Sequence, residues 1–374
     1  MQPTSVVPTP DPTDPRSALR VDARAISGEW RTDWSRTTVD LGGFAAALYG
    51  DDPRDRIPPI DEPVFESLEE AATWLTADSP GAVVRVEDEV RFYPLAMLTR
   101  HEIVNDRFGD LPVAVTFCPL CNTALAFERT VDGQELRLGV SGLLRHSDLV
   151  MWDDRTESLW QQATGEGIVG THAGRQLPVL STAIVSLGQF ASDHPDAVSL
   201  SRQTLFRTEY GGNPYPGYSS QSGPAIQFHA GDVDDRLHPM ARVVGVSVGE
   251  DHAAYAFDAL AEDRVVNDEV GDAPVVVLWA GDTLDALDHY RIIDSQAIGS
   301  GVAYFRTVDG VPLTFEALAD GEFVDLETGS TWSILGNATT GELAGARLDV
   351  VTHRNEFWFA FSAFFPEGRL HPGS

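Results

Sequence analysis

Apolar and polar residues alternate with a period of two along several short stretches of the chain. Residues 83–94 and 123–140 each alternate around a short turn, as the two strands of a β-hairpin do. The run 112–117 is almost wholly apolar and predicts a buried strand. Helical periodicity is weaker and is confined to 69–75, 94–104 and 181–194. The pattern therefore predicts an α+β fold made mostly of antiparallel β-strands.

The chain also contains an internal repeat. Residues 92–121 align with 254–283 at a constant offset, so that Tyr93 falls on Tyr255 and Asn105 on Asn267. The similarity continues after an insertion in the second copy, where Trp160 meets Trp332. Repeats of this length indicate one structural unit used twice. We expect two tandem pseudo-equivalent repeats that form one compact body.

Composition along the chain suggests five regions. The first residues are rich in proline, serine, threonine and aspartate, which bury too little surface to fold. The next segment carries several aromatic residues, which favours packing on the main body. The predicted regions are a disordered tail over 1–27, an irregular arm over 28–63, a first repeat over 64–200, a connecting loop segment over 201–240 and a degenerate second repeat over 241–374 that serves as scaffold.

The charge balance excludes some classes of function. The 374 residues include 57 Asp and Glu against 26 basic residues, all of them arginine, for a net charge of −31. A protein that neutralises nucleic-acid phosphates carries basic patches instead. An acidic chain without lysine is typical of proteins dissolved at high salt, and a codon bias towards arginine is the alternative. No run is apolar enough for a membrane span, and the first residues lack the pattern of a secretory signal, which favours the cytoplasm.

The two cysteines of the chain form the motif Cys118-Pro-Leu-Cys121 directly after a predicted strand. A pair at this spacing can act as a redox dithiol, in which one thiolate attacks a disulfide and its neighbour resolves the product. It can also supply two sulfur ligands to one metal ion. Two cysteines are too few for a disulfide-stapled secreted scaffold.

The second repeat has lost the residues that could form a site. At the offset of the repeat, Cys118 falls on Ala280, Cys121 falls on a threonine and His101 falls on an aspartate. Residues that only packed the repeat would be needed in both copies, so their loss from one copy favours a functional role. His101 could accept a proton from a thiol, or complete a Cys2His ligand set for zinc or copper.

Other polar residues are weaker candidates. Glu157, Trp160 and Gln161 lie with Gln162 in one short segment and could line a site, whereas the second repeat keeps only the tryptophan. Asn105 and the following aspartate occur in both copies, so we interpret them as a structural turn at the end of a helix. His146 and Met151 are soft donor types, but Met151 fits a core position better. The motifs of serine hydrolases, P-loop NTPases, zinc proteases and dinucleotide-binding proteins are absent from the sequence.

Four segments occur in an order that resembles the DUF3179 family: RIPPIDEPVF, HEIVND, TFCPLCNTALAFERTVDG and GVSGLLRHSDLVMWDDRTESLWQQATGEGIVG. The resemblance runs from about Trp30 to the end of the second repeat. It implies little about function, because the family is a domain of unknown function with members in bacteria and haloarchaea. Some members are named as selenoproteins, which favours redox chemistry at the cysteine motif, and a small polar residue is expected at His146. The family pattern falls here on His101, Cys118, Cys121, Asp153, Glu157 and Trp160.

Three hypotheses follow from the sequence. The first is a thiol-dependent redox protein in which His101 assists Cys118 and Cys121, with an unidentified small molecule or protein thiol as partner. In that protein, an oxidoreductase, substrate would contact Asp153, Glu157, Trp160 and Gln161. The second is a zinc or copper protein with Cys118, Cys121 and His101 as metal ligands. The third is a non-catalytic interaction scaffold, supported by the aromatic loop over 210–224.

Overall fold

The computed structural model of the chain describes residues 20–26, 30–48, 52–180, 182–206, 208–220, 229, 232–319 and 321–372. The predicted tail lies outside these residues up to position 19, and part of the aromatic loop does as well. No helix in the described part of the chain is long and apolar enough to cross a membrane.

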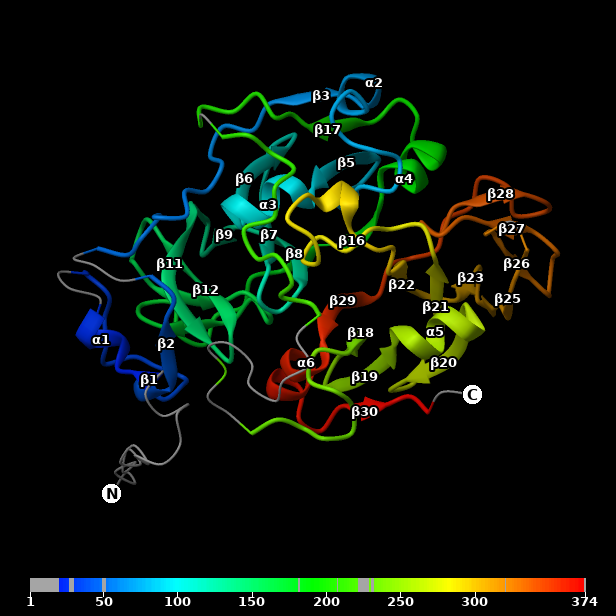
Figure 1. Cartoon of the computed structure of the whole chain (residues 1–374). Helices are drawn as coiled ribbons and strands as arrows, with labels where there is room; N and C mark the ends of the chain where they lie inside the picture. Colours follow the sequence, from blue (N-terminus) through cyan, green and yellow to red (C-terminus); the bar gives the residue numbers. More distant parts are fainter. Residues whose placement is uncertain are drawn as a thin grey trace.

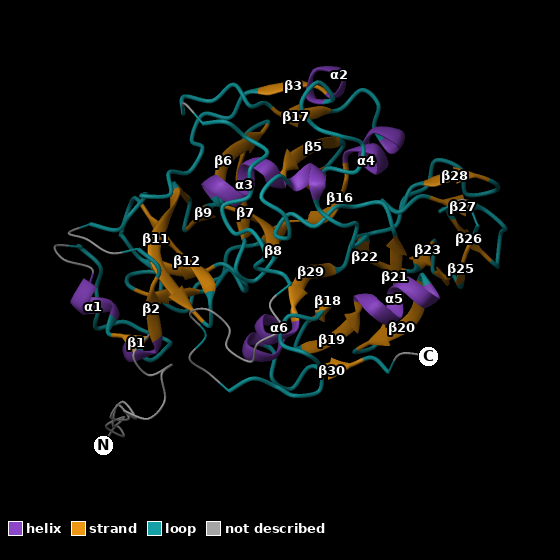
Figure 2. Cartoon of the chain, viewed as in Figure 1, coloured by secondary structure: helices purple, strands orange, loops and turns teal. Residues whose placement is uncertain are grey.

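Short strands dominate the structure, and the helices are short and lie between them (Figure 2). Almost all neighbouring strands pair antiparallel, with β17 on β5 and β19 on β30 as parallel exceptions. The predicted α+β class with mostly antiparallel sheets is confirmed. The helices are α1 (Ala23–Ile26), α2 (Leu68–Ala71), α3 (Leu95–His101), α4 (Leu187–Asp193), α5 (Phe257–Asp263) and α6 (Trp358–Phe364). Single 3-10 turns lie at Leu41–Gly43 and Ile292–Asp294.

The first 200 residues form three sheets and a small ribbon (Figure 1). One sheet has the order β16 (Thr182–Ser186), β4 (Pro80–Val86), β5 (Glu89–Pro94), β17 (Val198–Leu200) and β3 (Phe65–Ser67). A second has the order β15 (Val179–Leu180), β8 (Thr123–Glu128), β7 (Leu111–Cys118) and β6 (Ile103–Phe108). The third has the order β1 (Arg20–Val21), β2 (Phe44–Ala46), β11 (Leu138–Arg145), β12 (Asp148–Asp153), β13 (Leu159–Gln161) and β14 (Gly167–Val169), and the ribbon joins β9 (Thr130–Val131) to β10 (Gln134–Glu135).

All three predicted helices are shorter than expected, and the one predicted over 69–75 ends at Ala71. The helix predicted over 181–194 begins only at Leu187, because Thr182–Ser186 is strand β16. The β-branched residues there favour a strand, and Ser186 forms a capping box with Gln189 that starts the helix. The helix predicted over 94–104 ends at His101, since Glu102 adopts the left-handed conformation and the chain continues as β6. Asn105 therefore lies in a strand and not at the turn we expected.

The arm predicted over 28–63 contributes a strand to the main body. Phe44–Ala46 pairs antiparallel with β11, and Arg20–Val21 pairs with Phe44–Ala46 on its other side. Trp30 and Phe44 are buried in a cluster with residues of β12, β13 and β14. Apolar burial thus holds this segment against the third sheet.

The C-terminal part of the chain forms sheets in a closely similar order. One sheet has the order β29 (Thr352–Phe357), β18 (Arg242–Val248), β19 (Asp251–Ala256) and β30 (Arg369–Leu370). Another has β20 (Val265–Val270), β21 (Ala273–Ala280) and β22 (Ser300–Phe305). The remaining strands are β23 (Thr307–Val308), β24 (Val311–Pro312), β25 (Phe315–Ala317), β26 (Phe323–Asp325), β27 (Thr331–Trp332) and β28 (Ala338–Thr340).

One hydrophobic core extends through both parts of the chain. It contains Phe117 and Phe127 from the first part and Tyr304, Trp332 and Phe357 from the second. Strand β29 packs against β8 and β16, and β16 packs against β22. The two parts therefore meet along these strands, next to the turn that carries the cysteines.

Candidate functional site

Cys118 is the last residue of β7, and Cys121 lies in the turn that leads to β8. The turn closes through Asn122, whose φ of 60° places it in the left-handed region that asparagine tolerates. Strand β29 holds the turn from the other part of the chain. The side chain of Asn122 donates to the carbonyl of Asn355 at 2.9 Å, and the Phe357 amide donates to the carbonyl of Cys121 at 3.0 Å.

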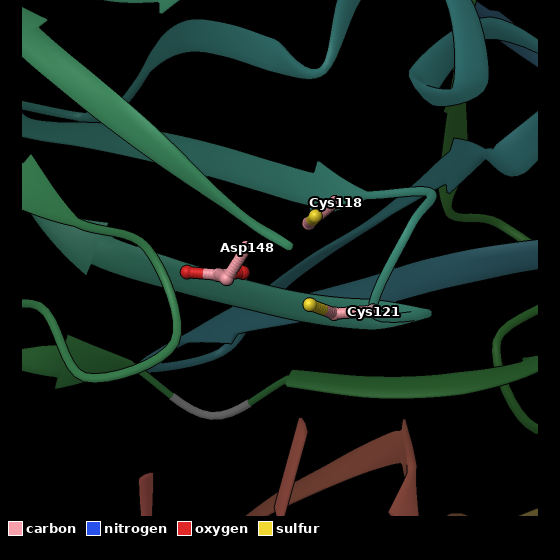
Figure 3. A group of neighbouring side chains, drawn as sticks. All are labelled: Cys118, Cys121 and Asp148. Carbon is pink, nitrogen blue, oxygen red and sulfur yellow. The ribbon is translucent and has the colours of Figure 1, made fainter. Parts of the chain in front are cut away.

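A carboxylate from another sheet meets the two thiols. Asp148 begins β12 after the turn residues His146 and Ser147, whose φ values of 53° and 64° are typical of a tight hairpin turn. The two Sγ atoms and a carboxylate oxygen of Asp148 all lie within 4.8 Å of one another (Figure 3). All three side chains are buried, and both cysteines are free thiols.

Gln161 and a backbone amide hold one oxygen of the Asp148 carboxylate, and the two thiols lie beside the carboxylate as weak donors. Its Oδ2 accepts hydrogen bonds from Nε2 of Gln161 at 2.5 Å and from the amide of Ala163 at 2.9 Å. Gln161 is oriented in turn by Arg145, which donates to its Oε1 at 3.3 Å. Among the residues that the structure describes, Oδ1 of Asp148 has no hydrogen-bond partner. A buried carboxylate oxygen without a donor is costly unless a further group binds it.

Burial disfavours the charged form of every acidic group around this site. It raises the pKa of the Cys118 thiol, raises that of Cys121 well above its usual range and raises the pKa of Asp148 to about 6. The charge of Glu102 also raises the pKa of Cys118. Burial, together with the charge of Asp148, raises the pKa of Glu102 itself to about 8. The site is thus a buried acidic cluster in which a cation would be strongly favoured.

Comparison with known protein families gives a match over most of the chain. The model of the family described as protein of unknown function (DUF3179) matches residues 54–368. The chain belongs to the DUF3179 family. No curated protein and no solved structure matches it significantly. The family assignment predicted from the sequence motifs is therefore confirmed, and it leaves the function of this DUF3179 protein to be inferred from the site itself.

His101 of this DUF3179 chain lies outside the group formed by the two cysteines and Asp148. Its Nδ1 lies 2.7 Å from the carbonyl of Pro58 and its Nε2 lies 2.8 Å from the hydroxyl of Tyr210. Both ring nitrogens therefore already have protein partners, and burial lowers the pKa of the ring. In the structure Asp148, and not His101, is the third member of the cluster, because His101 ends α3 with its ring turned towards Pro58 and Tyr210.

Three of the residues predicted to line a substrate site have structural partners instead. Asp153 accepts hydrogen bonds from the Trp160 indole at 3.0 Å and from the Thr156 amide at 2.7 Å. Glu157 forms ion pairs with Arg31 and Arg54, each at 3.0 Å. These contacts close the turn between β12 and β13 and attach the N-terminal arm to it.

Gln161 is the one member of that predicted set that contacts the cluster, through Asp148. Its neighbour Gln162 lies behind the cysteine turn, where its Nε2 donates to the Thr116 hydroxyl at 2.9 Å and to the Thr123 carbonyl at 3.0 Å. Both glutamines are buried. The unusual Gln-Gln pair after Trp160 therefore supports the site, although it does not form an open binding surface there.

Asp148 is the residue of this cluster that sequence reasoning missed. The hairpin that carries it belongs to a segment missing from the second repeat, so the loss that drew attention to the cysteines applied to Asp148 as well. The histidine next to it attracted attention as a soft ligand, but the structure packs the His146 ring against His229 and Phe364. Glu102 was also missed, because a glutamate directly after a helix is usually exposed.

Proposed function

We propose that this protein binds one transition-metal ion, with zinc as the first candidate, through Cys118, Cys121 and Asp148. The observation that carries the proposal is the convergence of two thiols and a carboxylate oxygen within 4.8 Å in a fully buried cluster. With zinc–ligand bonds of about 2.0–2.3 Å, donors in a tetrahedral set lie about 3.3–3.8 Å apart, so the cluster would close by at most about 1.3 Å around the ion. Gln161 and Ala163, which hold Oδ2, would orient the carboxylate as partners of metal ligands do.

The surroundings of the thiols favour a metal site over a reactive dithiol. Reactive cysteines lie in electropositive and partly exposed surroundings that stabilise the thiolate. Here both thiols are buried beside Asp148 and Glu102, so their pKa values rise. A divalent cation reverses this effect, since it stabilises thiolate and carboxylate together. The redox hypothesis is therefore the second candidate, with the closeness of the two Sγ atoms as its support.

The donor set favours zinc over monovalent copper. Copper in its monovalent state selects soft sulfur donors, whereas zinc accepts sulfur and carboxylate oxygen in one tetrahedral set. Three protein ligands leave a fourth position, which in zinc enzymes is taken by water or substrate. We therefore infer a three-ligand centre whose remaining position is available to a small ligand.

We further propose that the chain contains two tandem pseudo-equivalent repeats, of which only the first bears this centre. The support is the position of the elements: β4, β5, α3, β6 and β7 begin and end 162 residues before β18, β19, α5, β20 and β21. The strand registers follow the same offset, with Gly81 opposite Pro94 and Val243 opposite Ala256. Ala280 then stands where Cys118 stands in the first repeat, so the second repeat would act as scaffold at this position.

The test is the metal content of the purified protein. We expect about one equivalent of zinc in the wild-type protein and less than a tenth of that in the Cys118→Ser and Asp148→Asn variants. His101→Gln is the matched control, because it changes a buried residue near α3 without removing a proposed ligand. Replacement by Co²⁺ should add a cobalt–thiolate charge-transfer absorption that Cys118→Ser abolishes.

Two outcomes would contradict the proposal. Wild-type protein without any transition metal, and unable to take up zinc or copper after reduction, would favour the dithiol. Metal that is retained by Asp148→Asn but lost from His101→Gln would restore the Cys2His set instead. Each variant should first be shown to keep the wild-type circular dichroism spectrum, so that metal loss is not confused with unfolding.

A further inference from the structure

The C-terminal part of the chain contains a cavity of about 870 Å³, far along the chain from the cysteine motif. It lies at the start of α5 and is bounded by the beginning of β18, the end of β21 and the chain around His371. Much of its wall is apolar, including Met240, Phe257 and Ile298. Its volume falls within the range of about 300–1,000 Å³ usual for sites that bind small molecules.

Arg242 supplies a charged donor to this wall. Its side chain is 9% exposed, and one terminal nitrogen, Nη2, pairs with Oδ1 of Asp285 at 2.7 Å. The other, Nη1, is buried and has no hydrogen-bond partner among the residues that the structure describes. Asp285 also accepts hydrogen bonds from the Ser219 hydroxyl and the Leu287 amide, so its charge is shared among three donors. One terminal nitrogen of the guanidinium therefore lacks an acceptor, and a ligand would reach it after the side chains around it shift.

Trp279 supplies a second donor. Its indole Nε1 is also buried without a partner in the described part of the chain, and the residue lines the same cavity. The ring is seated against Gly299, where a Cβ atom would lie 2.4 Å from Cζ2 of the indole. Gly299 has a φ of 80°, so glycine is favoured there both by its backbone and by the space that the ring needs.

The corresponding positions of the first part of the chain carry neither donor. The residues 162 positions earlier are Pro80 and Phe117, whose side chains cannot donate a hydrogen bond. The cysteines show the reverse, since they are present only in the first part. At these positions the two donors belong to the second part of the chain alone, so packing that the two parts share does not account for them.

We propose that this cavity binds a small organic carboxylate with an apolar body. Arginine and tryptophan side chains are donors only, so a ligand that satisfies Nη1 of Arg242 and Nε1 of Trp279 must present acceptors. A carboxylate gains the additional strength of a charge-assisted hydrogen bond to the guanidinium. The apolar wall accommodates the rest of the ligand, and its burial adds to the binding free energy.

The carboxylate site is independent of the proposed metal centre. Neither cysteine nor Asp148 lines the cavity.

Calorimetric titration of the full chain tests this proposal. Acetate, hexanoate and benzoate serve as carboxylate probes of increasing apolar size, and benzamide is the neutral control for benzoate. We expect saturable binding of one benzoate or hexanoate per chain, at least tenfold weaker binding of acetate and of benzamide, and no change in Cys118→Ser. Trp279→Phe keeps an aromatic side chain but removes Nε1 together with part of the indole, and should weaken binding about fivefold, which at 1.4 kcal/mol per factor of ten is about 1 kcal/mol.

Arg242→Gln should weaken carboxylate binding at least tenfold and remove the preference for benzoate over benzamide. Since this change leaves Asp285 without its cation, the folded state of the variant should be verified, and Trp279→Phe provides the test that does not depend on it. Absence of saturable binding by all three carboxylates would overturn the proposal. Equal affinity of benzoate for the wild-type protein and Trp279→Phe would overturn it as well.

Discussion

The turn after β7 and the corresponding stretch after β21 differ in chemistry although their surroundings match closely. Asn105 accepts a hydrogen bond from the Leu138 amide at 3.0 Å, and Asn267 accepts one from the Phe315 amide at 2.9 Å. The buried tryptophans match as well, since the indole of Trp332 donates to Asp325 at 2.9 Å as Trp160 does to Asp153. These shared contacts connect sheets and close turns, so they are structural in both regions.

The two regions differ mainly around the cysteines. Ala280 and Thr283 stand in the positions of Cys118 and Cys121, and Arg264 stands in the position of Glu102. Glu102 and Arg264 even share the left-handed conformation, with φ values of 59° and 62°, yet Glu102 is buried and Arg264 donates to the carbonyl of Leu318. The comparison distinguishes two kinds of polar group within one molecule. Polar contacts that both regions share stabilise the fold, whereas the buried polar groups found only in the first region belong to the proposed metal centre.

The largest effect is expected when the cysteines of the first region are replaced by the corresponding residues of the second. A Cys118→Ala, Cys121→Thr double variant should lose metal binding completely. At a zinc concentration a thousand times the dissociation constant, the wild-type protein should gain about 4 kcal/mol of unfolding free energy, and the double variant should gain none. Denaturant unfolding with and without zinc measures both values. An equal gain in the double variant would place the metal elsewhere.

The next effect is a pH dependence that arises at Glu102 and that the corresponding residue of the second region, Arg264, should not show. Burial raises the pKa of Glu102 from its usual value of 4.5 to about 8 in the folded protein. Between these values the folded state binds more protons than the unfolded state, so the stability of the metal-free protein falls as the pH rises. Each pH unit in this range is worth about 1.36 kcal/mol. Between pH 5 and pH 8, the unfolding free energy of a Glu102→Gln variant should therefore rise by at most about 4 kcal/mol relative to that of the wild type.

Charges that face Glu102 determine how large this effect is. Asp148 raises its pKa further, and the hydrogen bond from the Tyr215 hydroxyl at 3.4 Å lowers it. Arg264→Gln is the matched control, because arginine stays charged throughout this pH range. Unfolding midpoints at pH 5 and pH 8 in one salt concentration give the comparison. A pH profile of Glu102→Gln parallel to that of the wild type would show that Glu102 is ionised in the folded protein.

The strands and the hairpins could be predicted from sequence because each depends on local pattern. The period-two alternation of residues 83–94 requires only a sheet with one buried face. Asp148 could not be predicted in the same way. Its meeting with Cys118 depends on how the sheet of β12 packs against that of β7, and no local signal encodes that approach.

The position of His101 also could not be predicted from local sequence pattern. A histidine 17 residues before a cysteine pair is chemically suited to the site, and the end of α3 was predicted close to it. The choice of partner was determined by Pro58 and Tyr210, which come from the arm and from the connecting segment. Contacts between segments far apart in sequence decided which candidate reached the thiols.

A smaller effect should appear in both regions when a shared contact is removed. Asp153→Asn and Asp325→Asn each replace a buried acceptor of several hydrogen bonds by a group that also donates. We expect each to reduce the free energy of unfolding by about 2 kcal/mol and to leave the metal content unchanged. Guanidinium unfolding and metal analysis on the same samples give the comparison. Loss of metal in Asp153→Asn alone would make Asp153 part of the site after all.

The smallest expected effect concerns the turn that presents Cys121. Asn122→Ala removes the hydrogen bond to Asn355 and places alanine at a positive φ, which together should reduce the unfolding free energy by about 1–2 kcal/mol. Asn122→Gly is the matched variant, because it removes the same hydrogen bond without the backbone penalty. If the hydrogen bond orients the turn, both variants should bind zinc a few times more weakly in a competition titration with a chelator. If only Asn122→Ala weakens zinc binding, the backbone conformation of the turn, and not its attachment to β29, positions the thiol.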